Sequence, residues 1–281
     1  MDYLKLKREL SSIASKDLEQ RKFWYSPSAE AYNASRPKYP KELIRKAIDL
    51  ARLSDSSRVL ELGSGPGTAT VPFAELGCSM VCLEPNPDFY ELATINCKSH
   101  PSVQLINQSF EEWHLEPESF DAVLAASSMH WLPGEIGYAK AHAALKEGSH
   151  LILLWNKEPQ LCESMQNALS SVYQQHAPSL DRYEDRKTQE DILHGLGQMM
   201  IESGLFENLV AGVVEAHLSY SPDRYISLLS TYSPYLKLDQ HARGSLFAGI
   251  KQCLLEAGVD EIGLSYLSAY HIGQRVSNFG A

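Results

Sequence analysis

The chain has 281 residues, 44% of them hydrophobic, which is enough for one large α/β domain with an added cap or for two small domains. Its formal net charge of -10 argues against DNA, bulk RNA or an anionic membrane as the main partner. The five cysteines include no Cys-x-x-Cys pair, which argues against a disulfide framework and a structural zinc site. With neither a signal peptide nor an apolar run of transmembrane length, the sequence predicts a cytoplasmic protein without a bound metal.

The first 40 residues predict a helix followed by an aromatic segment. Residues 2–20 place apolar side chains among many charges, as on a surface helix that packs on its own domain. Residues 23–40 gather five aromatic rings around Arg36, and these rings either pack against the domain or close over a ligand. Residues 41–53 have apolar side chains at helical spacing and predict the first helix that flanks a sheet.

A glycine-rich turn follows the first predicted strand. Residues 58–62 are an apolar run typical of a buried parallel strand, and Gly63, Gly65 and Gly67 precede a predicted helix over 69–76. This geometry binds nucleotides, because the missing side chains let a ligand approach the backbone and the helix offers its N–H groups. The alternative is a tight turn with no ligand. Glu84 favours the ligand, because it ends a second apolar run at the distance where an acid binds ribose hydroxyls.

The spacing of the glycines points away from a dinucleotide. The dinucleotide fingerprint has its third glycine or alanine three residues after the second, where this chain has Thr68. The Gly-Lys-Ser/Thr of a phosphate-binding loop is also absent. Glu61 lies just before the turn, and its charge would repel a pyrophosphate but suits a cation. We therefore expect an adenosine ligand without phosphates that carries a sulfonium and an ammonium group.

Further signals continue the alternation of strands and helices. A helix is predicted from residue 86 or 87 to about 97 and another over 138–146, with strands over 103–106, 120–126 and 149–155. The right-handed crossover rule makes a doubly wound parallel sheet the natural fold for these units. Residues 127–132 follow the carboxyl end of the fourth strand, where open α/β sheets bind their ligands.

The C-terminal part departs from this alternation and predicts a cap. Helices are expected over 159–173, 189–202, 222–232 and 240–257, and strands over 209–220 and 264–276. Six tyrosines between residues 220 and 270 either pack inside the cap or meet a substrate. We expect three regions, namely an N-terminal helix and lid over 1–40, a binding core over 41–156, and the rest of the sheet with an inserted helical cap over 157–281.

Two motifs resemble those of class I S-adenosylmethionine (SAM)-dependent methyltransferases: Glu-Leu-Gly-Ser-Gly-Pro-Gly-Thr over residues 61–68 and Leu-Glu-Pro-Asn-Pro over 83–87. Tyr-x-x-x-Arg-Pro-x-Tyr-Pro over 32–40, Phe-Asp-x-Val over 120–123 and His-Trp at 130–131 are similar to the type-11 branch, which includes trans-aconitate and quinone-biosynthesis methyltransferases. The resemblance covers most of residues 23–156. It implies a Rossmann-like, seven-stranded, mostly parallel sheet with an antiparallel last strand and an inserted helical cap.

The resemblance also implies which residues hold SAM. Arg36 would pair with the SAM carboxylate, Tyr32 would help to close the lid, and Phe89 would lie against the adenine. Ser109 replaces the acid that often bonds the adenine amino group in this family, so Ser109, Phe110 and Glu111 are the candidates for that contact. The whole expected set of SAM-binding residues is Tyr32, Arg36, Glu61, Gly63, Ser64, Gly65, Gly67, Thr68, Glu84, Pro85, Phe89, Ser109, Phe110, Glu111, Ala126 and Ser127.

His130 is the one catalytic candidate. By the resemblance it would point toward the transferred methyl group and act as a general base. The alternative is a histidine at a helix start whose hydrogen bonds are satisfied within the fold. Base catalysis is not obligatory here, because the sulfonium is already a strong electrophile and the protein mainly aligns donor and acceptor.

These features predict an enzyme that transfers a methyl group from SAM to oxygen or carbon of a small molecule, by in-line displacement in a capped pocket. The protein would be a monomer or a homodimer. A nicotinamide-dependent oxidoreductase is one alternative, although the glycine spacing speaks against it. The other is a SAM-binding module without turnover, which would serve as a sensor or a partner subunit.

Overall fold

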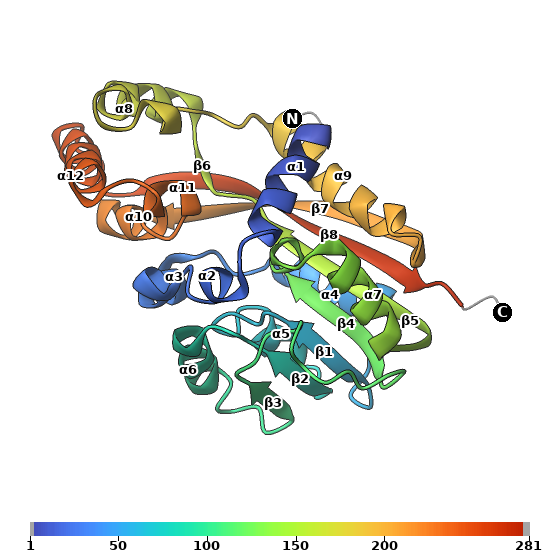
Figure 1. The fold of residues 1–281 in the computed structure, drawn as a ribbon. Helices are drawn as coiled ribbons and strands as arrows, with labels where there is room; N and C mark the ends of the chain where they lie inside the picture. Colours follow the sequence, from blue (N-terminus) through green and yellow to red (C-terminus); the bar gives the residue numbers. More distant parts are fainter. Residues whose placement is uncertain (1–2, 278–281) are drawn as a thin grey trace.

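The computed structural model of the chain describes residues 3–277 and is built on an eight-stranded sheet (Figure 1). Residue 2 of the expected first helix, and the outer ends of the first and third expected regions, lie outside the described residues. The strands are β1 (Arg58–Leu62), β2 (Ser79–Leu83), β3 (Val103–Ile106), β4 (Phe120–Ala126), β5 (Leu145–Asn156), β6 (Gln160–Leu161), β7 (Phe206–Tyr220) and β8 (Ile262–Arg275).

The sheet has the order β3-β2-β1-β4-β5-β8-β6, and β7 also pairs with β8. Strands β1 to β5 pair in parallel, while β8 runs antiparallel to β5, β6 and β7. The predicted α/β fold, mostly parallel with an antiparallel last strand, is therefore confirmed. The additional strand is β6, which lies where a helix was expected to begin. Pro159 keeps the chain before it extended, and the helix begins only after Cys162.

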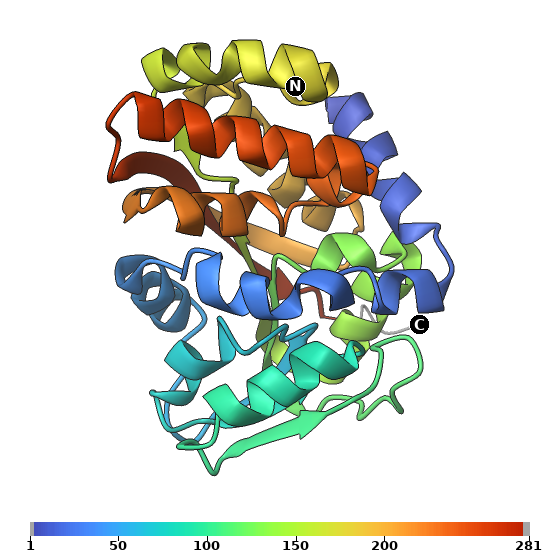
Figure 2. The same cartoon turned by 90° about the vertical axis from the view of Figure 1, so that its left-hand side faces the viewer.

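Helices flank the sheet on both faces and cover one of its ends (Figures 1 and 2). They are α1 (Tyr3–Ala14), α2 (Leu18–Lys22), α3 (Ala29–Ser35), α4 (Lys41–Leu50), α5 (Thr70–Ala74), α6 (Pro87–Asn96), α7 (Gly134–Ala144), α8 (Glu163–His176), α9 (Arg186–Glu202), α10 (Pro222–Leu229), α11 (Ser233–Leu236) and α12 (Gln240–Glu256). Among residues 3–277, none of them has the length and apolar character needed to cross a bilayer.

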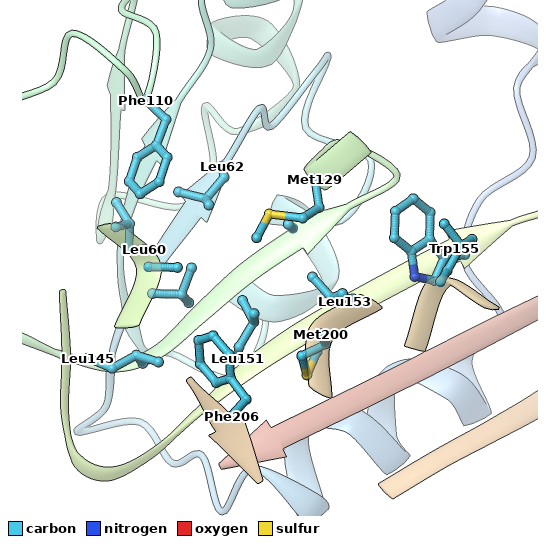
Figure 3. Close-up of a cluster of buried hydrophobic side chains, with 14 of the residues drawn as sticks. Leu60, Leu62, Phe110, Met129, Leu145, Leu151, Leu153, Trp155, Met200 and Phe206 are labelled. Carbon is cyan, nitrogen blue, oxygen red and sulfur yellow. The ribbon is translucent and has the colours of Figure 1, made fainter. Parts of the chain in front are cut away.

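The two faces of the sheet carry separate apolar layers, because side chains alternate along each strand. Leu60 and Leu62 of β1 point into the layer toward α7 and α9, which Figure 3 shows in part. Val59 points to the opposite layer, which contains residues of α4 and α5. Both faces of the central strands are thus buried, as expected for a doubly wound sheet.

The cap lies beyond the end of the parallel sheet. Its helices α8, α10, α11 and α12 surround a third apolar cluster, and the long strands β7 and β8 extend beneath them (Figure 1). In Figure 2, α2 and α3 lie between this cap and the half of the sheet that contains β1, β2 and β3. The N-terminal segment therefore separates the two parts.

Candidate functional site

A cavity of about 480 Å³ opens at the carboxyl ends of β1, β2 and β4. The glycine turn after β1 forms one wall, the segment around α2 and α3 forms another, and the turns after β4 and β5 form a third. Ligands of open α/β sheets bind at this edge, where the strand order reverses. The cavity is therefore in the place that the fold predicts for a ligand.

The glycine turn presents bare backbone to this cavity. Gly65 has a φ of +58°, a conformation that side chains rarely adopt, and a Cβ atom built on it would meet nothing within 4 Å. Gly63 has a φ of +64°, and a Cβ there would lie 3.0 Å from the Cβ of Ser128. The turn thus needs glycine for its conformation, and at Gly65 it faces open space that a ligand can enter.

Glu84 connects the two loops that border this open space. Its carboxylate accepts hydrogen bonds from the backbone N–H of Gly65 at 2.7 Å and from that of Asn86 at 2.8 Å. Burial raises the pKa of Glu84 to about 7, and these two hydrogen bonds act against that rise. Each carboxylate oxygen can accept a further bond, so Glu84 can still receive the hydroxyls of a ribose.

Three residues of the expected SAM-binding set lie behind the cavity wall. Glu61 is fully buried beneath the turn, where it accepts a 2.6 Å hydrogen bond from the Thr70 hydroxyl. Ser109 pairs with the carboxylate and the backbone N–H of Glu112. Gly67 faces Cys97, whose sulfur would lie 3.1 Å from a Cβ at that glycine. The other expected residues all line the cavity.

Arg36 joins the N-terminal segment to the cap. Its guanidinium lies between the rings of Tyr32 and Tyr232, at 4.7 and 4.0 Å from the ring centroids. Nε donates to Oγ1 of Thr231 at 2.7 Å, and Nη2 donates to the Thr231 carbonyl at 2.8 Å. Within residues 3–277 Nη1 has no hydrogen bond, so Arg36 keeps a donor for an anion in the cavity.

Phe89 belongs to an aromatic group that forms the lid side of the cavity. Its ring centroid is 4.9 Å from that of Tyr32 and 6.0 Å from that of Tyr25. Asn86 caps the helix that carries Phe89 and also donates to the Lys22 carbonyl and the Ser26 hydroxyl, which fixes the lid to the sheet. The sequence predicted Asn86 only as a possible helix start, since contacts across 60 residues leave no local signal.

His130 lies in a short 3-10 turn after β4, between two indoles. Its ring centroid is 5.5 Å from that of Trp131 and 5.7 Å from that of Trp155. Burial lowers the pKa of His130 to about 4, so the ring is neutral at pH 7. Its Nδ1 is buried without a hydrogen-bond partner within residues 3–277. A neutral imidazole at the cavity wall can accept a proton or a hydrogen bond, and its catalytic role stays a prediction.

The part of the cavity wall that α1 and α9 form was not predicted from the sequence. Helices α1 and α9 contribute leucines and isoleucines to its wall, and the loops after β5 and before α9 contribute an ion pair, Lys157 to Glu184 at 2.8 Å. The apolar spacing over residues 2–20 predicts a helix that packs on its own domain, which is also true of α1. Over residues 3–277, no three His, Cys, Asp or Glu side chains gather closely enough to hold a metal ion.

The family model, the relative and the two solved structures described here are all named as methyltransferases. Residues 59–148 match a family model described as a methyltransferase domain. An uncharacterized methyltransferase of Mycobacterium tuberculosis is 32% identical over 132 residues, a match that covers 47% of this chain and 51% of that protein. The chain therefore spans about half the length of the curated relatives that it matches.

Solved structures show the same fold. A protein from Anaeromyxobacter dehalogenans, assigned as a type II methyltransferase, superposes with a TM-score of 0.65 at 20% identity, over 85% of this chain and 97% of that one. Phosphoethanolamine N-methyltransferase 2 of Haemonchus contortus, solved with S-adenosyl-L-methionine, gives a TM-score of 0.51 at 15% identity, over 92% and 59%. At these identities the likeness shows the fold alone.

Proposed function

We propose that the protein transfers a methyl group from SAM to a small-molecule acceptor, starting from the match of residues 59–148 to a methyltransferase domain. The observation that carries the proposal is the pairing of Gly65 with Glu84. An open glycine backbone and a buried carboxylate meet at one edge of the cavity, and this edge suits an adenosine better than a pyrophosphate because of its negative charge.

The residues present fit SAM at both of its ends. The adenosyl end has Glu84 for the ribose hydroxyls, with Phe89 and Phe110 on the wall beside it. The amino-acid end has the unpaired Nη1 of Arg36 for the carboxylate. The motif Gly63 to Thr68 leaves room between these ends, because a Cβ at Gly65 would meet no protein atom within 4 Å.

Bound SAM supplies a methyl group that is already electrophilic. The chain contributes alignment, which can provide roughly 7 kcal/mol at good geometry, and excludes water. Arg36 of the lid contacts the rings of Tyr32 and of Tyr232 in the cap. His130 stands neutral in the wall, where it can accept a proton from an acceptor hydroxyl. Methylation at oxygen, or at carbon of an activated acceptor, is the chemistry that this wall supports best.

A labelled-methyl assay tests this function. Purified protein is incubated with SAM labelled in the methyl group and a metabolite extract, and the labelled product is identified by mass. We expect a labelled small molecule that Glu84→Ala protein does not form. Binding of SAM without any labelled product would favour a module without turnover. Binding of NAD in place of SAM would favour an oxidoreductase, and either result would overturn the proposal.

A further inference from the structure

The cavity continues past the expected SAM residues into an apolar compartment between α1 and α9. We call this the acceptor compartment, and its aliphatic wall consists of Leu6, Leu10 and Ile13 of α1 with Ile192, Leu193 and Leu196 of α9. None of these side chains belongs to the motifs that resemble the methyltransferase family. An apolar wall of this kind favours an apolar ligand by roughly 25 cal/mol for each Å² that is removed from water.

The helix α1 is held closely on α9, so the compartment has a defined outer wall. Gly195 allows the approach, because a Cβ there would lie 2.8 Å from Cδ2 of Leu6 and 3.1 Å from Cδ2 of Tyr3. On the outside, Lys7 and Glu202 form an ion pair at 2.8 Å between the same two helices. Leu10 and Ile13 are half-buried and face the cavity, whereas Leu4 on the same helix is 64% exposed.

Aromatic side chains also line this part of the cavity. Trp131, His130 and Trp155 follow one another with ring centroids 5.5 and 5.7 Å apart, and all three line the cavity. Two buried nitrogens of this row, Nδ1 of His130 and Nε1 of Trp155, have no hydrogen-bond partner within residues 3–277. A neutral hydroxyl or carbonyl group on a ligand matches such nitrogens, because neither of them carries a charge.

The charges around the whole cavity are balanced, which disfavours a strongly charged acceptor. Among the described residues, as many cationic as carboxylate side chains line it. The cations are Arg21, Lys22, Arg36, Lys157 and Arg182, and the carboxylates are Glu9, Glu84, Glu111, Glu158 and Glu184. Two pairs are already formed, Arg21 to Glu111 at 2.6 Å and Lys157 to Glu184 at 2.8 Å. A multiply charged acceptor would have to break them.

We propose that the acceptor is an uncharged compound with an apolar body, which lies between α1 and α9 and brings its reactive atom to His130. The proposal rests on the proposed function, because it assigns the half of the cavity that SAM does not need. The wall residues Leu10 and Ile13 then determine specificity. They select an apolar acceptor without touching the cofactor.

Binding of N-phenyl-1-naphthylamine, an uncharged apolar fluorophore, tests this assignment in the full chain saturated with S-adenosylhomocysteine (SAH). We expect the wild type to bind the probe. The double variant Leu10→Asn/Ile13→Asn should bind it about tenfold more weakly or worse, since polar groups replace apolar wall. The matched control Leu4→Asn makes the same chemical change on the exposed side of α1 and should keep the wild-type affinity for the probe.

Calorimetric titration of SAH separates this proposal from the proposed function. Unchanged SAH affinity in the double variant, with lost probe binding, supports the acceptor compartment. Equal probe affinity in the double variant and the wild type would overturn it, as would displacement of the probe by the trianion tricarballylate. If the double variant also loses SAH binding, the single variants Leu10→Asn and Ile13→Asn are measured instead. Their affinities for the probe and for SAH are then judged by the same criteria. Absence of SAH binding in the wild type would instead refute the proposed function.

Discussion

Gly65 is the residue at which a side chain would occupy the space that the ligand needs. Its left-handed conformation alone makes a side chain cost about 1–2 kcal/mol of folding free energy. A side chain there would also enter the cavity, because no protein atom lies within 4 Å of its Cβ. We predict that Gly65→Val folds with reduced stability and does not bind SAH, as measured by thermal unfolding and calorimetry.

Gly204 provides the control for this variant. It has a φ of +71° and equally open space around a built Cβ, but it follows α9 and does not line the cavity. Gly204→Val should lose a similar amount of stability and keep its affinity for SAH. Wild-type SAH affinity in Gly65→Val, or an equal loss of affinity in both variants, would show that the turn does not contact the cofactor.

Glu84 should contribute to binding as a charged acceptor for ribose hydroxyls. Replacement by glutamine keeps the size but removes the charge and one acceptor oxygen, so we predict that Glu84→Gln weakens SAH binding by about 1–3 kcal/mol. Glu91→Gln, on the exposed side of the following helix, is the matched control and should leave the titration unchanged. An unaltered dissociation constant in Glu84→Gln would remove the ribose contact from this account.

His130 should act in the transfer step and not in cofactor binding. We predict that His130→Asn lowers kcat by roughly 100-fold, the lower end for general base catalysis, while SAH affinity stays the same. Because its pKa of about 4 lies below the working range, the ring does not titrate between pH 6 and 8. An unchanged kcat in His130→Asn would contradict the role in transfer, and a break in the wild-type pH profile near pH 6.5 that disappears in His130→Asn would contradict the lowered pKa.

At the residue scale, the sequence predicted the part of the cavity wall that the motif residues form, because motif residues in a strand–turn–helix unit have fixed places. It misplaced Glu61 for a reason that the sequence contains. Val59 and Glu61 share one face of β1, by the alternation of side chains, and Val59 belongs to the layer against α4 and α5. Glu61 therefore points under the turn to Thr70. The bond of Ser109 to Glu112 belongs to a local turn.

At the scale of elements, the contact between the lid and the cap passes through Thr231. This residue is fully buried in the connection between α10 and α11, and its Oγ1 accepts the Nε–H of Arg36. We predict that Thr231→Val, which keeps the shape and removes the acceptor, weakens SAH binding by about 1 kcal/mol. Ser230→Ala removes a neighbouring hydroxyl that bonds only within α10 and should have no effect. Equal losses in the two variants would mean that Thr231 does not position Arg36.

The order and type of the elements were largely predictable, because their apolar periodicity is strong. The predicted and observed helices differ where a polar residue or a proline interrupts the apolar pattern. The expected helix over 2–20 is two helices, since Asp17 caps a new one by accepting the N–H of Gln20 at 2.8 Å. The expected helix over 222–232 ends at Leu229, and Pro234 helps to begin α11. The packing of α1 on α9 was not predictable, since it depends on Gly195, far away in the sequence.

At the scale of the whole molecule, two buried carboxyls make stability depend on pH. Burial raises the pKa of Glu61 and of Glu84 to about 7, above their ordinary value of 4.5. Between pH 4.5 and pH 7 the folded state therefore binds more protons than the unfolded state. The free energy of unfolding consequently falls as the pH rises through this range. Each group accounts for about 2–3 kcal/mol of that fall.

We predict that Glu61→Gln removes its share of this dependence. The difference in unfolding free energy between pH 5 and pH 8 should shrink by about 2 kcal/mol relative to the wild type, as measured by urea denaturation. Glu75→Gln changes an exposed carboxyl and should leave the difference as it is. A Glu61→Gln protein with the full wild-type dependence would mean that this carboxyl ionises normally in the fold.

The methyltransferase class that the glycine turn and its neighbours predict is confirmed for residues 59–148, which match a methyltransferase domain. The division into three regions, the cytoplasmic location and the state as monomer or homodimer stay predictions. The cap has its own apolar cluster, made of residues from 161 onward. The chemical class of the methyl acceptor that we propose could not be deduced from the sequence, because α1 and α9 meet only in the fold.

Isothermal titration of the full chain with SAH and, separately, with NAD tests the central claim most directly. The account predicts one SAH site per chain, weakened in Glu84→Gln, and no heat with NAD, because Glu84 and the glycine turn form a site for an adenosine without phosphates. Absence of SAH binding, or NAD binding that competes with SAH, would contradict it.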